Sequence, residues 1–122
     1  MQLHHVYLPQ AAACAALRHR RRRLARRLAA LRRCSDQAFA QQFPACVAAV
    51  ETAFREEEAL LDRLDAPCLH PRLADHALIL CALHRTAFRV EAGDLGRGRE
   101  VAAALEAILA PPLPDFLRAQ RV

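Results

Sequence analysis

Apolar residues recur at alternating spacings of three and four in four segments of this chain, and this repeat constrains the fold more than any other feature. Such spacings place the apolar side chains on one face of an α-helix. The four segments cover residues 14–31, 44–64, 71–90 and 100–110. Three prolines end the last segment, because proline cannot donate a backbone hydrogen bond, and only a short turn over residues 115–120 is expected beyond them. The sequence therefore predicts an all-α protein.

The connections between these segments are short. Residues 35–36, 65–70 and 91–98 are rich in the polar, proline and glycine residues that are typical of turns. Short loops between long amphipathic helices favour antiparallel neighbours. A chain of 122 residues, of which 54% are apolar, has room for one core. We expect one domain over residues 1–122, folded as an up-down-up-down antiparallel four-helix bundle.

The start of the second helix has two interpretations. A helix that begins at Pro44 agrees with the apolar repeat. Alternatively, Phe39 and Phe43 form an earlier turn of the same helix, and Pro44 makes a kink inside it.

The cysteines and the lack of long apolar runs bear on the compartment. The cysteine count of five is odd and no CxxC pair occurs, which excludes an evident disulfide framework or zinc knuckle. No leader peptide opens the chain, and no apolar run approaches the roughly 18 residues that a membrane span needs. We expect a cytoplasmic protein with no membrane partner. A small alanine-rich bundle also leaves apolar surface uncovered, which favours a homodimer.

Charged and polar residues interrupt the apolar faces of three of the predicted helices. Arg21, Glu57, Arg72 and His76 all fall at positions that the repeat reserves for buried side chains. A lone ionised group in an apolar core costs several kcal/mol, so such groups must pair with one another, bind a ligand or reach solvent. Facing side chains in a bundle core are also where metal and ligand sites are built. These four residues are therefore the candidate site.

The segment "AFREEEALLD", residues 53–62, and the histidine at position 76 resemble the hemerythrin family. The second helix of that family carries a His-Phe-x-x-Glu-Glu motif, and its third helix opens with His-x-x-x-His. The resemblance implies a four-helix bundle around a di-iron centre that binds oxygen. Five histidines are terminal ligands of that centre, while one glutamate and one aspartate bridge the two metals.

Only part of this ligand set is present. The resemblance makes Glu57 the bridging glutamate, His76 the second histidine of the pair, and Asp115 a candidate for the bridging aspartate. At three other positions the chain lacks the family's histidine. These are Ala53, Arg72 and Ala110. Two iron ions require more nitrogen and carboxylate donors than the remaining residues supply.

Two residues compete for the ligand position of the first helix. His19 would keep a histidine there, but it lies about 200° around the helix from Arg21. Because Arg21 lies on the apolar face and His19 does not, the periodicity favours Arg21.

The arginines suggest what took the place of the metal. Two metal ions bridged by two carboxylates can become two guanidinium groups that meet the same carboxylates. Arg21 and Arg72 supply the positive charge, and Glu57 and Asp115 supply the carboxylates. We therefore expect ion pairs instead of a metal cofactor, in a protein that has lost reversible oxygen binding and acts as a non-enzymatic binding or interaction module.

A working iron protein is the first alternative. A mononuclear or altered di-iron centre would use Glu57, His76, Asp115 and His19, and would serve in oxygen, nitric oxide or iron sensing or storage.

A basic adaptor for nucleic acid or for an acidic partner is the second alternative. The run "RHRRRRLARRLAALRR", residues 18–33, can neutralise phosphates. No aromatic residue lies among its arginines, so the run offers no platform for stacking bases. We expect polyanions to bind it through charge alone, without specific recognition of nucleic acid.

Overall fold

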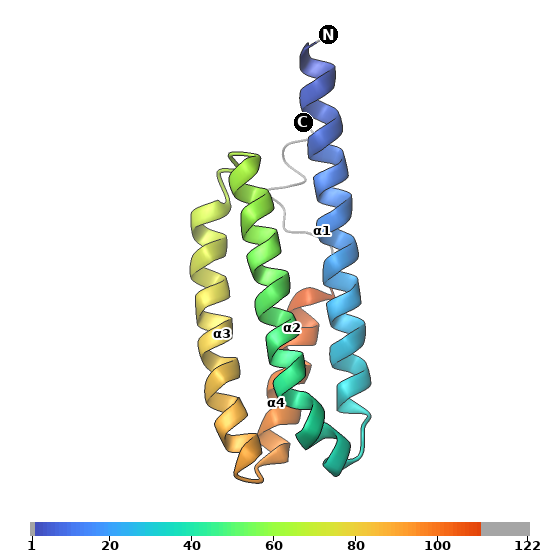
Figure 1. The fold of residues 1–122 in the computed structure, drawn as a ribbon, viewed down its shortest axis with the longest axis vertical. Helices are drawn as coiled ribbons and strands as arrows, with labels where there is room; N and C mark the ends of the chain where they lie inside the picture. The colour runs from blue at the N-terminus through green and yellow to red at the C-terminus, as the bar shows by residue number, and fades with distance from the viewer. Residues whose placement is uncertain (1, 111–122) are drawn as a thin grey trace.

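The computed structural model describes residues 2–110, with side chains from residue 11, and within this part every regular element is a helix (Figure 1). The helices are α1 (Gln2–Arg32), α2 (Asp36–Arg63), α3 (Leu69–Glu91) and α4 (Leu95–Leu109). The predicted all-α class with four helices is confirmed. None of these helices is long and apolar enough to cross a membrane.

Each helix packs mainly against two others, and α2 and α4 also touch across the bundle. α1 lies against α2 and α4, and α3 lies against the same two helices on their other side. Figure 1 shows the chain turning back at each of the three loops, and it shows the first turns of α1 extending past the loop between α2 and α3. The four helices enclose the larger apolar core at the end of the bundle where α4 lies, and a smaller cluster of Leu17, Leu61 and Cys68 lies toward the other end.

α2 begins eight residues before Pro44, so the prediction that the helix starts at Pro44 was wrong. Asp36 is the first residue of α2, and the Ser35 hydroxyl caps the helix by accepting a hydrogen bond of 3.3 Å from the amide of Ala38. Pro44 lies inside the helix, where it removes one backbone hydrogen bond. Phe39 and Phe43 are both buried and pack against each other, which holds the early turns in place.

α4 also begins earlier than the sequence indicated. Residues 91–98 were expected to form a loop, but the loop is only residues 92–94. Asp94 accepts a hydrogen bond of 3.2 Å from the amide of Arg97 and so caps a helix that starts at Leu95. Gly93, with a φ of 99°, makes the turn before this cap. The glycines at residues 93, 96 and 98 suggested a loop, but the Asp94 side chain caps a helix at this point.

The buried face of α4 is rotated from the predicted one. The apolar repeat of the last segment, Val101, Leu105 and Ile108, predicts that Ile108 is buried, but Ile108 is 53% exposed and Leu109 is buried in its place. The buried face follows Gly98, Ala102, Leu105 and Leu109. Its first two members are small, so α4 can lie close to its neighbours at the end where Phe39 and Val90 fill the interior.

Gly98 and Gly96 provide a test of this close packing. A Cβ atom at Gly98 would lie 2.6 Å from Val90 Cγ2 and 2.7 Å from Phe39 Cε1, whereas one at Gly96 would meet only Asp94 Oδ1 at 4.0 Å. We expect Gly98→Ala to lower the free energy of unfolding by about 1–3 kcal/mol through overpacking. Gly96→Ala, the matched control, should leave stability unchanged or raise it by up to about 1 kcal/mol, because alanine favours helix. Urea unfolding of both variants measures the difference, and equal effects would contradict the packing described.

Candidate functional site

The site is built around the carboxylate of Glu57, which points from α2 into the bundle. The side chain of Glu57 is only 8% exposed. Arg21 reaches it from α1 and holds both of its oxygens: Arg21 Nε donates to Oε1 at 3.1 Å, and Nη2 donates to Oε2 at 3.1 Å. Two parallel hydrogen bonds between a guanidinium and a carboxylate are stronger and more directional than a single contact. This fork therefore joins α1 to α2 inside the bundle.

α3 contributes two further basic groups on the opposite side of Glu57. Arg72 and His76 are one helical turn apart, so both face the same carboxylate. Arg72 Nε lies 3.7 Å from Glu57 Oε2, and His76 Nε2 lies 3.0 Å from the same oxygen. The contact of Nε2 is short, but its geometry does not meet that of a directed hydrogen bond. Glu57 is thus the meeting point of three helices.

His76 is held from two more directions by α2. Its Nδ1 lies 2.7 Å from Glu58 Oε2, and its ring stacks on Phe54 with centroids 3.8 Å apart and planes inclined by 6°. Because Phe54 and Glu58 are four residues apart, both reach the ring from one face of α2. The side chain of His76 is only 3% exposed, and its contacts with Phe54 and Glu58 fix the orientation of the ring. We refer to Arg21, Glu57, Glu58, Arg72 and His76 as the Glu57 cluster.

The cluster keeps Glu57 ionised despite its burial. Burial alone raises the pKa of Glu57, but its interactions with His76 and Arg21 and their positive charge outweigh burial and lower the pKa from 4.5 to about 2. The pKa of Arg72 is lowered by burial and by the charge of Arg21, while Glu57 opposes that shift. Arginine nevertheless stays charged in proteins. The two buried arginines therefore repel each other, and Glu57 between them compensates for this repulsion.

The other residues expected at the site lie elsewhere. His19 is exposed on the outside of α1, while Arg21 points inward, as the periodicity of the sequence favours. Ala53 is half-buried and Ala110 is exposed. Asp115 lies outside the residues that the structure describes.

The described residues do not supply the donors that a di-iron centre requires. Both oxygens of Glu57 are held by Arg21, and Arg72 adds a second positive charge beside them. Among the side chains that the structure describes, those of residues 11–110, no group of three or more His, Cys, Asp or Glu is arranged to hold a metal ion. A metal cation would have to displace one guanidinium and lie beside the other. The arrangement suits a carboxylate held by cationic side chains.

Two contacts of this cluster were not expected from the sequence. Phe54, Glu57 and Glu58 all match the His-Phe-x-x-Glu-Glu motif, but the contacts of Phe54 and Glu58 with His76 were not predicted. A signal was available, because Phe54 and Glu58 are four residues apart and therefore lie on one face of the same helix. A cavity of about 290 Å³ also borders Arg21, Arg72 and His76, and the apolar side chains of Leu78 and Ile108 lie at its edge.

Comparison with known proteins adds no relative: neither a family model, nor a curated protein, nor a solved structure matches this chain.

The depressed pKa of Glu57 predicts how stability depends on pH. Its folded-state pKa of about 2 lies below its ordinary value of 4.5, so the stability it contributes is present above pH 4.5 and is lost as the pH falls toward 2. At neutral pH we expect Glu57→Gln to lower the free energy of unfolding by about 3 kcal/mol, since two buried guanidinium groups lose their carboxylate. The difference between wild type and variant should shrink as the pH falls.

Urea unfolding at pH 7, 4.5 and 3 measures this dependence. Glu56→Gln is the matched control, because Glu56 is the adjacent residue of α2 and is exposed. It should change the free energy of unfolding by less than about 1 kcal/mol at each pH. If the loss of unfolding free energy in Glu57→Gln stays constant from pH 7 to pH 3, the charge of Glu57 is not the source of that loss.

Proposed function

We propose that this chain is a hemerythrin-like, up-down-up-down antiparallel bundle that has lost reversible oxygen binding and acts as a non-enzymatic binding or interaction module. One observation carries the proposal: the Arg21 guanidinium holds both oxygens of Glu57, the residue that the resemblance makes a bridging ligand. A carboxylate engaged in this way cannot also bridge two metals. Arg72 stands at a histidine position of the family and adds the second positive charge.

The chemistry of the cluster supports a structural role for its residues. His76 is buried, with Nδ1 against Glu58 and Nε2 against Glu57. The ring also stacks on Phe54, so the imidazole is enclosed by side chains of α2. Its role in this proposal is to orient the cluster and to fix α3 against α2.

The proposal extends to compartment and assembly. All five cysteines are free, and Cys46 and Cys68 are buried, which suits a reducing cytoplasmic setting. Burial raises the pKa of both thiols, so they stay protonated as small core residues. The exposed apolar side chains of Leu78, Phe88 and Ile108 would favour a homodimer.

Iron loading tests the proposal. We expect the purified wild-type protein, incubated anaerobically with ferrous iron and then desalted, to retain far less than stoichiometric iron and to show no oxo-bridge absorption band in air. The double variant Arg21→His/Arg72→His removes both guanidinium groups and adds two imidazole donors. It should retain several times more iron than the wild type.

Stoichiometric iron in the wild type, with an absorption band that appears on exposure to air, would favour the alternative of an iron protein with an altered ligand set. Iron content is measured by inductively coupled plasma mass spectrometry on both proteins, and circular dichroism confirms that each is folded.

A further inference from the structure

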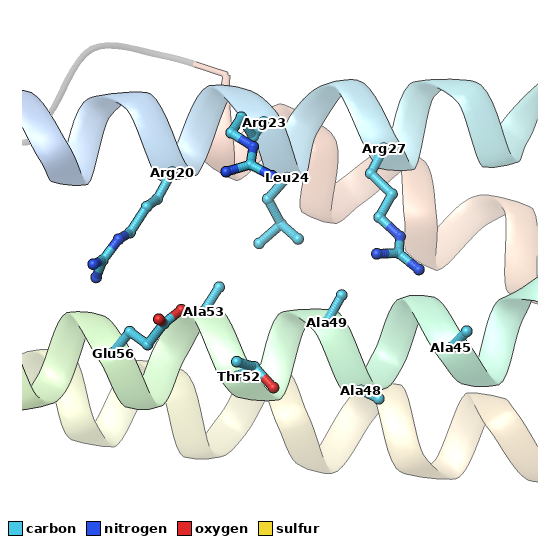
Figure 2. Close-up of a pocket in the computed structure, with 10 residues that line it drawn as sticks. All are labelled: Arg20, Arg23, Leu24, Arg27, Ala45, Ala48, Ala49, Thr52, Ala53 and Glu56. Carbon is cyan, nitrogen blue, oxygen red and sulfur yellow. The ribbon is translucent and has the colours of Figure 1, made fainter.

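A groove between α1 and α2 lies on a different face from the Glu57 cluster. Its volume is about 550 Å³, and Figure 2 shows it opening between the two helices. Its lining comes from both helices. The residues are Arg20, Arg23, Leu24 and Arg27 of α1, and Ala45, Ala48, Ala49, Thr52, Ala53 and Glu56 of α2. We call it the arginine groove.

The groove exists because α2 faces α1 here with small side chains. Ala45, Ala49 and Ala53 recur every four residues and point toward α1 (Figure 2). Only Leu24 reaches into the space between the helices as a large apolar side chain, and it is buried at the bottom. Alanine methyl groups cannot fill the remaining gap. The floor of the groove is therefore formed largely by alanine methyl groups from Ala45 to Ala53, and the groove extends over about 16 Å of α2, from Ala45 to Glu56.

One wall of the groove is strongly basic. Arg20, Arg23 and Arg27 lie along α1, and Figure 2 shows Arg20 and Arg27 extending toward α2. Among the described residues, none of these three arginines forms an ion pair with a carboxylate. Glu56 is the single acidic residue of the lining, so the groove carries an excess of positive charge. Unpaired arginines beside an apolar floor attract a ligand that has both carboxylates and apolar side chains.

We infer that the arginine groove binds an acidic amphipathic helix of a partner protein. This inference rests on the proposed binding function and names its partner class. A helix laid in a groove presents apolar residues at spacings of three, four and seven, and here these would contact the alanine floor. Small floor residues let the helix approach closely, and its acidic flanks would pair with the arginines of α1. The length of the groove along α2, about 16 Å, corresponds to about three turns of a bound helix.

Two other occupants fit the groove less well. A nucleic acid would find arginines for its phosphates, but the lining has no aromatic side chain for its bases and an apolar floor where it needs polar contacts. A second copy packed face to face would bring the same three arginines against these, because a two-fold contact uses the same surface twice. Charge complementarity therefore favours an acidic helix.

A designed peptide tests the inference on the full chain. The probe is a labelled amphipathic peptide of about 15 residues, with leucines on one face and glutamates on the other. A peptide of the same composition in scrambled order is its control. We expect fluorescence anisotropy to show that the ordered peptide binds at least about tenfold more tightly than the scrambled one, because only the ordered peptide can present both faces.

Variants of α1 separate the groove from simple charge. Arg23→Ala/Arg27→Ala should weaken binding of the ordered peptide about tenfold or more. Arg22→Ala/Arg26→Ala removes the same charge from exposed positions of α1 outside the groove lining, and it should weaken binding no more than about twofold. Ala45→Trp, at an exposed position of the floor that points toward α1 (Figure 2), fills the groove without changing charge and should also weaken binding about tenfold.

Equal loss of peptide binding from both arginine pairs, or unchanged peptide binding by Ala45→Trp, would overturn the inference. Two other results would also overturn it. One is a mixed-sequence oligonucleotide whose binding is weakened by Arg23→Ala/Arg27→Ala while peptide binding is not. The other is self-association, measured by sedimentation, that only Arg23→Ala/Arg27→Ala abolishes. These readouts are independent of iron content. A failure of peptide binding would thus leave the proposed loss of the metal centre standing, and iron uptake by the wild type would leave the groove result standing.

Discussion

The carboxylate of Glu57 stays ionised inside the bundle, and the positions of three helices depend on it. α1 supplies the fork of Arg21, and α3 supplies Arg72 and His76, so removing the charge would leave basic groups buried on two helices at once. Ion pairs of this kind add little net stability compared with apolar packing, but breaking one is costly. We infer that the cluster specifies the relative placement of these helices, while the apolar core supplies most of the stabilisation.

The cluster and the arginine groove are two consequences of the same arginine-rich helix. Arg21 points into the bundle and fixes α1 against α2, while Arg20, Arg23 and Arg27 face the neighbouring groove. Because the alanine floor cannot fill the space between the helices, the width of the groove depends on contacts such as Arg21 with Glu57. The ion pairs of the Glu57 cluster therefore help to fix the width of the basic groove.

Helical periodicity predicted the fold class and placed Arg21, Glu57, Arg72 and His76 on buried faces. It could do so because the spacing of apolar residues along one helix is visible directly in the sequence. The starts of α2 and α4 were harder to predict, since Ser35 and Asp94 begin these helices through capping hydrogen bonds, although Pro44 and the glycines near Asp94 suggested later starts. The contacts of Glu58 with His76, and the groove, depend on how α1, α2 and α3 are placed in three dimensions. Periodicity along one helix carries no information on that placement.

The coupling between Arg21 and Glu57 tests this account most directly. A double-mutant cycle with Arg21→Met and Glu57→Gln, measured by urea unfolding at pH 7, isolates the interaction of the two side chains. We expect each single variant to lower the free energy of unfolding by about 3 kcal/mol or more. The double variant should lower it by at least about 1.5 kcal/mol less than the sum of the two single effects, because neither side chain then leaves the charge of the other unpaired. Additive losses, or single variants as stable as the wild type, would contradict the claim that this buried ion pair holds α1 against α2.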